Sequence, residues 1–260
     1  MNYFVEGLQG SGKSTLTDKL ARLYPDHTTV REGDYSPVEL AWCAYMEKAD
    51  YGKMLDRFSA LRSRIEERSY PENDRMIVCY TKVRTEDQNF YRELEKYEIY
   101  NNRVAPDAFR RIILERFRKW TGGQAIFECS LFQNIVEDLM MFREASDEEI
   151  LAFYREIRQA LEGKEYRILY LKTQDIAGNL QVIRRERSEE QGRELWFPMM
   201  LDFFDNCPDS RTRGLSGEKD LLEHFARRQE LELRICREVF PDRYTILHSK
   251  DYQDSELAAL

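Results

Sequence analysis

The chain has 260 residues and a formal net charge of −8, so it can form a sizeable α/β core and lacks the basic excess of a general nucleic-acid-binding protein. No run of about twenty apolar residues occurs, and no basic flank precedes an apolar segment, which argues against a membrane span and a secretory signal. The five cysteines are scattered without a Cys-x-x-Cys pair, which favours reduced thiols in a cytoplasmic protein.

The first predicted elements are a strand, a glycine-rich loop and a helix. Residues 3–5 are apolar, the sequence GLQGSGKS follows from Gly7 to Ser14, and leucines at helical spacing come next. Gly-x4-Gly-Lys-Ser between a strand and a helix is the phosphate-loop pattern. It predicts a nucleoside triphosphate site, in which backbone N–H groups and the helix dipole hold the phosphates.

Each residue type in this loop has an expected role. The residues that we assign to the nucleotide are Gly7, Gly10, Ser11, Gly12, Lys13, Ser14 and Thr15. We expect Lys13 to be exposed and to neutralise the β and γ phosphates, and the Ser14 hydroxyl to bind Mg²⁺. The alternative is a glycine turn that joins a strand to a helix by chance.

The second predicted strand, residues 28–31, leads into Glu32-Gly33-Asp34. Ligands of open parallel sheets bind beyond the carboxyl ends of the strands, so these carboxylates are candidates for the base that deprotonates a phosphoryl acceptor. Asp34 is our first choice, because Gly33 would free it from the strand, and Glu32 is the second. A solvated charged turn is the alternative.

Residues 35–105 form a predicted helical, tyrosine-rich insertion on the acceptor side. Trp42 and Tyr45 are spaced to lie on one side of a helix, either as core residues or stacked on a planar acceptor. The apolar run 76–80 is either a short strand or a buried connector.

The third predicted strand, residues 125–127, is followed by Glu128, which could bind Mg²⁺ or cap the next helix. After the fourth strand, residues 168–171, comes an arginine-rich stretch with Arg184, Arg185 and Arg187. We expect a lid at about 184–192, in which these arginines contact the phosphates. A solvated helix face, balanced by glutamates, is the alternative.

A fifth apolar run lies at 244–247, and helical patterns separate the five runs. This alternation predicts parallel βαβ units in a single α/β domain over 1–260. The clearest helices are expected after Pro106, after the Ser146 capping box, and from about Ser216 to Phe240, where Pro241 stops the pattern.

These motifs together resemble the P-loop nucleoside and nucleotide kinases, most of all the deoxynucleoside kinases, with thymidylate kinase a near relative. Besides the phosphate loop, the resemblance lies in Ser36-Pro-Val with Trp42-Cys, in Glu128-Cys-Ser, and in the lid with Glu189-Glu-Gln-Gly. It implies a five-stranded parallel sheet wrapped by helices, and ATP with Mg²⁺. It also implies γ-phosphate transfer to a small molecule, with roles for Lys13, Ser14, a carboxylate after the second strand, Glu128 and the lid arginines.

The acceptor is predicted as a (deoxy)nucleoside or a nucleoside monophosphate. Cys129 stands where the family has an arginine, and Glu-Gly-Asp replaces Glu-Pro, so another alcohol such as an antibiotic is an alternative acceptor. A nucleotide-dependent ATPase or GTPase switch is the alternative from another class, although the guanine motif Asn-Lys-x-Asp is missing. The choice of ATP over GTP and the formation of a homodimer are left open.

Overall fold

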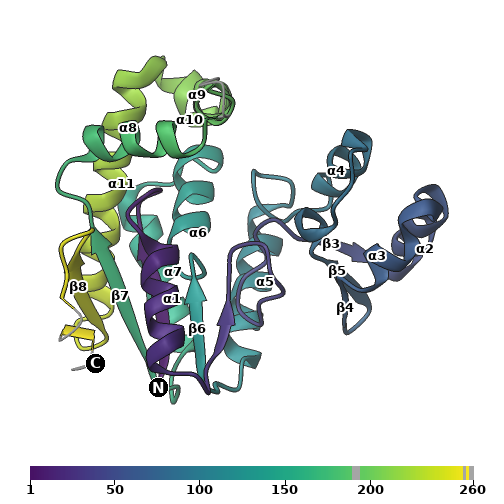
Figure 1. Cartoon of the computed structure of the whole chain (residues 1–260), viewed down its shortest axis with the longest axis horizontal. Coiled ribbons are helices and arrows are strands. Elements are labelled where there is room, and N and C mark those ends of the chain that lie inside the picture. Colours follow the sequence, from purple (N-terminus) through teal and green to yellow (C-terminus); the bar gives the residue numbers. More distant parts are fainter. Residues whose placement is uncertain (189–193, 254–255, 258–260) are drawn as a thin grey trace. The chain divides into compact units, whose positions relative to one another are not determined.

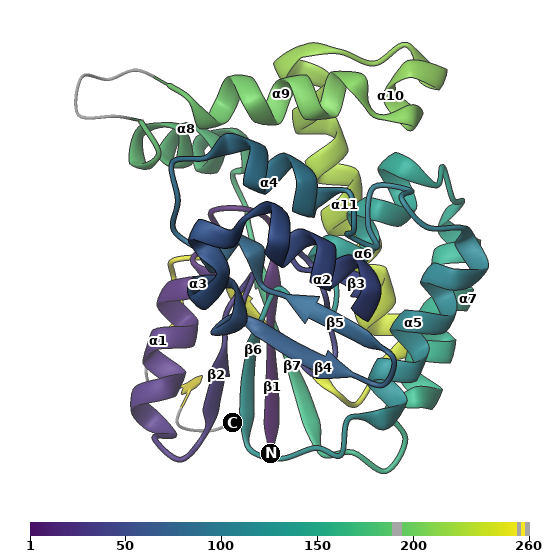
Figure 2. The ribbon, with the colours of Figure 1, turned by 90° about the vertical axis from the view of Figure 1, so that its right-hand side faces the viewer.

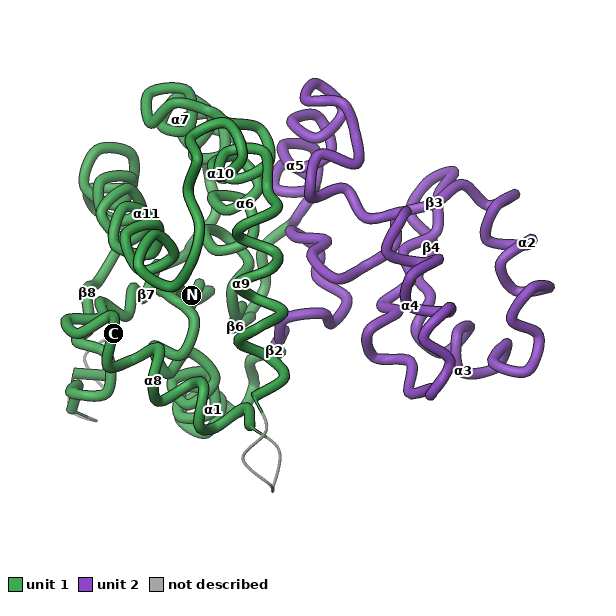
Figure 3. Tube along the Cα trace, turned by 90° about the horizontal axis from the view of Figure 1, so that it is seen from above, with its two compact units in different colours: residues 1–29, 121–260 green, residues 30–120 purple. Residues whose placement is uncertain are grey.

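The computed structural model of the chain describes residues 1–188, 194–253 and 256–257. The chain divides into two compact units, one made of residues 1–29 and 121–260 and the other of residues 30–120 (Figure 3). The first unit contains the glycine-rich loop, and the second contains the predicted acceptor-side insertion.

A five-stranded parallel sheet forms the centre of the first unit, in the order β2-β6-β1-β7-β8 (Figures 1 and 2). Its strands are β1 (Asn2–Gly7), β2 (Thr28–Val30), β6 (Ala125–Glu128), β7 (Tyr166–Lys172) and β8 (Tyr244–His248). Each corresponds to one of the five predicted apolar runs. The prediction of an α/β fold with a parallel five-stranded sheet flanked by helices is thus confirmed.

Alternate residues of β1 face opposite sides of this sheet, as the pleat of a strand requires. Tyr3 and Val5 pack in one cluster with Leu16 and Leu20 of α1 (Lys13–Leu23). Phe4 belongs to the other face, which the helices α7 (Asp147–Ala160) and α11 (Gly217–Val239) cover (Figure 1). Because both faces are covered by helices, the strands are apolar along most of their length.

The boundaries of the longest helices follow local signals. Ser146 accepts a hydrogen bond from the Glu149 N–H, and the Glu149 side chain accepts one from the Ser146 N–H, so the predicted capping box opens α7. Helix α11 ends at Val239, two residues before Pro241. The other helices of the unit are α6 (Gln133–Glu137), α8 (Ile176–Glu186), α9 (Trp196–Asn206) and α10 (Pro208–Arg213), with a π-helical turn at Asp138–Phe142. Among the described residues, no helix combines the length and apolar character needed to cross a bilayer.

The second unit contains a small antiparallel sheet that we did not predict. Its strands β3 (Ala44–Glu47), β5 (Arg75–Val78) and β4 (Ser69–Glu72) pair in that order. The apolar run at 76–80 therefore begins as a strand, which was one of its two predicted forms. The helical placement of Trp42 and Tyr45 was wrong, because Trp42 lies in a turn with a φ of 62° and Tyr45 belongs to β3.

Helices of the second unit are α2 (Lys48–Arg57), α3 (Arg62–Glu66), α4 (Gln88–Glu95) and α5 (Pro106–Lys119). Short 3₁₀ turns occur at Ser59–Leu61 and Tyr80–Lys82. The unit has an apolar cluster of its own, in which Phe58 and Phe90 meet edge to face with ring centroids 5.3 Å apart.

Candidate functional site

The glycine-rich loop joins the end of β1 to the start of α1 within the first unit. Gly7, Gly10 and Gly12 have φ angles of 140°, 70° and 92°, which L side chains rarely adopt. A Cβ built on Gly7 would lie 2.6 Å from the carbonyl oxygen of Leu171, and one on Gly10 would lie 2.1 Å from Cγ1 of Ile183. Glycine at these two positions is therefore required both by the backbone conformation and by the close approach of β7 and α8.

Lys13, the predicted phosphate-binding cation, is buried, so the expectation that it is exposed was wrong. Its Nζ donates to the carbonyl oxygens of Gly7 at 2.9 Å and Leu8 at 2.7 Å, and only 7% of the residue is accessible. The loop curls around the ammonium group, and its carbonyl oxygens replace the water that the charge loses. The lysine is thus fixed within the loop by the chain itself.

Side chains from distant parts of the chain bind two other carbonyl groups of the loop. Asn179 Nδ2 donates to the carbonyl oxygen of Gln9 at 2.7 Å, and Ser249 Oγ donates to that of Ser11 at 2.7 Å. Lys250 Nζ in turn donates to Oδ1 of Asn179 at 3.1 Å. These bonds hold the loop carbonyls, while N–H groups in the first turn of α1 have no partner within the helix and suit an anion.

Ser14 and Glu128, the two predicted Mg²⁺ ligands, are in contact. Ser14 Oγ donates to Oε1 of Glu128 at 2.5 Å, which links the first turn of α1 to the last residue of β6. A hydroxyl and a carboxylate are hard oxygen donors, which Mg²⁺ accepts together with water and phosphate oxygens. Among the described residues, no cluster of three Asp, Glu, His or Cys side chains could hold a metal alone.

Arg184, a predicted clamp arginine on α8, is held by acidic side chains of the same unit. Its Nη2 lies 2.9 Å from a carboxylate oxygen of Glu194, and its Nη1 lies 3.0 Å from one of Glu218. The guanidinium also lies over the ring of Phe197, 4.0 Å from the centroid. The hydrogen bond that Arg184 donates to Glu194 raises the pKa of Arg184. In this conformation the guanidinium of Arg184 is held by other side chains of the protein.

The other two predicted clamp arginines are placed differently. Arg187 lies just after α8, with its guanidinium 4.7 Å from the ring centroid of Trp196, and Arg185 is exposed. Such a cation–π contact contributes about 0.5–1 kcal/mol at exposed sites, so Arg187 can leave it at a small cost. Residues 189–192 of the predicted lid lie outside the described residues.

A buried ionic network lies on the face of the sheet that α11 covers. The fully buried Arg228 pairs with Glu137 and, at 3.2 Å, with Glu232, and Tyr170 donates to Glu232 at 2.6 Å. Gln9 of the glycine-rich loop donates to Glu137 at 2.9 Å. The network therefore connects the loop to α11 through side chains.

Glu6 precedes the first glycine of the loop and is also fully buried. Burial raises the pKa of Glu6 to about 7, while hydrogen bonds from backbone N–H groups oppose that rise. These bonds come from Leu131 at 2.6 Å and Gln133 at 3.4 Å. Glu6 thus ties the strand that leads into the loop to the segment after β6.

The two candidate bases belong to the second unit. Asp34 pairs with Lys82 at 3.1 Å and accepts the backbone N–H of Arg31 at 3.1 Å, and its side chain is 38% exposed. Glu32 accepts a hydrogen bond from Nε1 of Trp42 at 2.9 Å. Each carboxylate has a side-chain partner of its own, so these contacts do not select one of them as the base.

Sequence reasoning missed five residues that contact the loop, Arg184 or Asn179: Asn179, Glu194, Glu218, Ser249 and Lys250. Ser249 and Lys250 follow β8 directly, so the rule that ligands gather beyond the carboxyl ends of parallel strands would have indicated them. Asn179 and Glu218 have no local signal, because their partners lie 170 and 34 residues away along the chain.

No protein-family model matches this chain, and a comparison with curated proteins finds no relative.

Proposed function

We propose that this protein is an ATP-dependent phosphotransferase that transfers the γ-phosphate of ATP to a hydroxyl or phosphate oxygen of a small molecule. The observation that carries this proposal is the contact between Ser14 and Glu128 at the end of a glycine-rich loop with a buried lysine. A carboxylate from a neighbouring strand, held against the loop hydroxyl, can help to bind Mg²⁺ in phosphoryl transfer. A turn that only joins a strand to a helix does not need such a carboxylate.

The residues of the loop would bind and orient the nucleotide. Lys13 and the N–H groups at the start of α1 are proposed to neutralise the phosphates, and Ser14 and Glu128 to hold Mg²⁺. When bound, Mg²⁺ would supply positive charge that stabilises the phosphate oxygens. Arg185 is exposed and Arg187 is held by a cation–π contact, so either could turn toward a phosphate, whereas Arg184 would first exchange its carboxylate partners.

The proposed transfer forms one bond to phosphorus and breaks another. An oxygen of the acceptor forms a bond to the γ-phosphorus, the bond from that phosphorus to the bridging oxygen breaks, and ADP leaves. For a hydroxyl acceptor, the proton passes to a carboxylate, with Asp34 as the first candidate and Glu32 as the second. The acceptor class that we propose is a (deoxy)nucleoside or a nucleoside monophosphate.

The proposal is tested by measuring ADP release from ATP and Mg²⁺ with a panel of nucleosides, nucleoside monophosphates and aminoglycoside alcohols. Glu128→Gln keeps the shape of the side chain and removes its charge. We expect this variant to need a higher Mg²⁺ concentration for half-maximal transfer. We also expect that Mg²⁺, compared with EDTA, increases the affinity of the variant for ATP less than it increases that of the wild type. The exposed Glu223, 67% accessible, provides the matched control Glu223→Gln.

Two results would reject the proposal. One is slow ATP or GTP hydrolysis that no acceptor stimulates, which would favour a nucleotide-dependent switch. The other is equal Mg²⁺ dependence in the wild type, Glu128→Gln and Glu223→Gln.

A further inference from the structure

Two buried cysteines of the second unit are in contact. Cys43 precedes β3 and Cys79 follows β5, and these antiparallel strands pair Ala44 with Val78. The two cysteines are therefore the next facing positions beyond that pair, and Sγ of Cys43 donates a hydrogen bond to Sγ of Cys79 at 3.6 Å. Both are free thiols in this structure. The proposed function assigns no role to this pair.

The backbone at these two positions suits a disulfide bond. Facing residues of antiparallel strands have Cα atoms about 4.5–5.5 Å apart. Disulfides join Cα atoms that are about 4.4–6.8 Å apart, so the two strands need no rearrangement to be linked here. The sulfur atoms of Cys43 and Cys79 have to approach from 3.6 Å to about 2.05 Å, which rotation of the side chains can provide.

The surroundings of Cys79 favour its thiolate. The hydrogen bond from Cys43 lowers the pKa of the Cys79 thiol, and the cations Lys82 and Arg68 act in the same direction, while burial and Asp34 oppose them. Backbone hydrogen bonds tie both cations to this site: the Cys79 N–H donates to the carbonyl oxygen of Arg68 at 2.9 Å, and the Lys82 N–H donates to that of Cys79 at 3.0 Å. A thiolate close to cations is the reactive form of cysteine.

The surroundings of Cys43 favour its neutral thiol. The hydrogen bond that Cys43 donates to Cys79 raises the pKa of Cys43, and burial raises it further. The buried carboxylates of Glu39 and Glu98 act in the same direction. The two thiols therefore differ, with Cys79 as the nucleophile and Cys43 as the thiol that reacts second.

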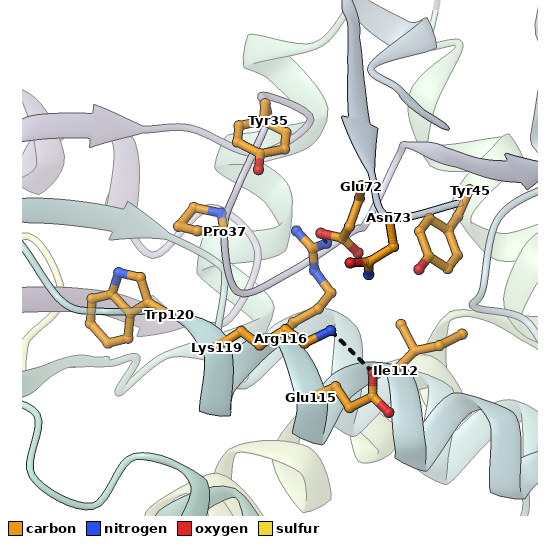
Figure 4. A pocket seen from close by; sticks show the side chains of 10 residues that line it. All are labelled: Tyr35, Pro37, Tyr45, Glu72, Asn73, Ile112, Glu115, Arg116, Lys119 and Trp120. Atoms are coloured by element: carbon orange, nitrogen blue, oxygen red, sulfur yellow. Dashed lines mark hydrogen bonds and ion pairs between the residues drawn. The ribbon is translucent and has the colours of Figure 1, made fainter. Parts of the chain in front are cut away.

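The burial of both thiols limits the oxidant to a small molecule. Cys43 and Cys79 are each 1% exposed. The described residues that line a cavity of about 170 Å³ in the same unit include Tyr35 and Tyr45 but neither cysteine (Figure 4). The exposed Trp42 is adjacent to Cys43, so the pair lies close to the surface of the unit. A small peroxide can reach such a site during a brief local opening, whereas a bulky disulfide reagent needs a larger one.

We propose that Cys43 and Cys79 are a redox modification site, which a small peroxide such as hydrogen peroxide converts to a disulfide and a dithiol reductant restores. Cys79 gives up its proton, its sulfur forms a bond to one peroxide oxygen, the O–O bond breaks, and the leaving hydroxide takes the proton to form water. The sulfur of Cys43 then attacks the sulfenic acid on Cys79 and displaces its hydroxyl, which leaves as a second water with the Cys43 proton. The two thiols are oxidised by two electrons, and the peroxide is reduced by two.

The disulfide would also change the surroundings of a candidate base. Sγ of Cys43 lies 4.0 Å from the carbonyl oxygen of Asp34, and this contact loses its S–H donor when the disulfide forms. The inference itself does not depend on the proposed function, because the disulfide is detected without ATP or an acceptor.

The test is oxidation of the full, folded chain with excess hydrogen peroxide, followed by alkylation, tryptic digestion without reductant and mass spectrometry. Lys48 and Arg75 separate the two cysteines, so the disulfide joins two different peptides. Dimedone, which traps sulfenic acids, is added to the single variants Cys43→Ser and Cys79→Ser. Cys207→Ser is the matched control, because Cys207 is buried to the same degree and a serine can also cap α10.

We expect the wild type to lose two of its five thiols and to form the peptide linked through Cys43 and Cys79. This link should form at least about tenfold faster than any other pairing, because the two sulfur atoms are already in contact. Dithiothreitol should restore both thiols. Cys207→Ser should form the same link at the rate of the wild type. Dimedone should mark Cys79 in Cys43→Ser and should leave Cys43 unmarked in Cys79→Ser.

Three results would overturn the proposal. Thiols could be consumed without a link between Cys43 and Cys79, or other pairings could form as fast in the folded chain. The link could survive dithiothreitol, which would show that it is not reversible. Dimedone could mark Cys43 rather than Cys79, which would contradict the order of reaction. If a single variant does not fold, as judged by circular dichroism, the peptides of the wild type and of Cys207→Ser decide the matter.

Discussion

Ser249 Oγ donates a hydrogen bond of 2.7 Å to the carbonyl oxygen of Ser11, across 238 residues of the chain. The segment around it packs against the same part of the first unit. The ring of Tyr252 lies under Nζ of Lys19 at 5.0 Å, and Leu257 is fully buried in the cluster that contains Leu16 of α1. The residues that follow β8 therefore help to fix the glycine-rich loop and the helix that begins from it.

The first prediction concerns this bond. Ser249→Ala should weaken ATP binding by about 2- to 10-fold, because a hydrogen bond contributes about 0.5–1.5 kcal/mol and the freed loop must be ordered again when ATP binds. The measurement is the Kd for ATP from calorimetry. Ser216→Ala is the control, since Ser216 is exposed and its side chain makes no capping bond. Equal Kd values in the two variants would show that Ser249 does not position the loop.

The second prediction concerns the burial of Lys13. Lys13→Met should abolish phosphoryl transfer and should also lower the melting temperature without ligand, because two loop carbonyl groups lose their donor. An unsatisfied buried polar group costs about 1–3 kcal/mol. Lys48→Met, at an exposed lysine at the start of α2, controls for the loss of a charge. A melting temperature equal to that of the wild type would mean that the loop carbonyls find other partners at no cost.

The third prediction concerns Arg187. A lysine keeps the charge and loses the planar fork of donors that matches a phosphoryl group. Arg187→Lys should therefore lower kcat for the proposed transfer by roughly 10-fold or more, with a smaller change in the KM for ATP. Steady-state kinetics measures both, and Arg237→Lys on the exposed face of α11 is the control. A change in KM alone would assign Arg187 to ground-state binding of the nucleotide.

The fourth prediction concerns pH and the second unit. Burial raises the pKa of Glu39 from 4.5 to about 8. Between these values the folded chain binds the Glu39 proton more tightly than the unfolded chain, so this group lowers the stability of the fold as the pH rises. The loss approaches about 1.4 kcal/mol per pH unit for a single group. Glu39→Gln, which carries no charge at any pH, should therefore gain stability relative to the wild type as the pH increases from 5 to 8.

Denaturant unfolding across this pH range checks that prediction. The quantity to compare is the difference in the free energy of unfolding between variant and wild type at each pH. Glu66→Gln, at a side chain that is 51% accessible, provides the control. A difference for Glu39→Gln that does not vary with pH would show that Glu39 is already ionised at pH 5 in the folded chain.

Local patterns in the sequence were sufficient for the frame of the first unit. The five apolar runs became the five parallel strands, and the capping box at Ser146 and the stop before Pro241 set the ends of two helices. These features depend on residues within one or two turns of each other, so a sequence pattern contains the information that decides them. The spacing of the residues in the glycine-rich loop is likewise a local pattern that the sequence contains.

The second unit shows where such patterns fail. Trp42 and Tyr45 have helical spacing, yet the chain turns at Trp42 and continues as β3, which pairs with β5 about thirty residues later. The preference of a short segment for helix or strand is worth a fraction of a kcal/mol per residue, and pairing with a distant strand outweighs it. The small antiparallel sheet was therefore beyond the reach of local reasoning.

The same distinction holds within the candidate site. The sequence alone determined which residue types make up the glycine-rich loop, because glycine, lysine and serine stand there at the spacing of the phosphate-loop pattern. Only the tertiary structure decided that Lys13 is buried, that Asn179 and Ser249 hold the loop carbonyls, and that Arg184 is bound by Glu194 and Glu218. These contacts join residues that lie apart along the chain, so each hydrogen bond or ion pair depends on where the packed helices and strands place the two side chains.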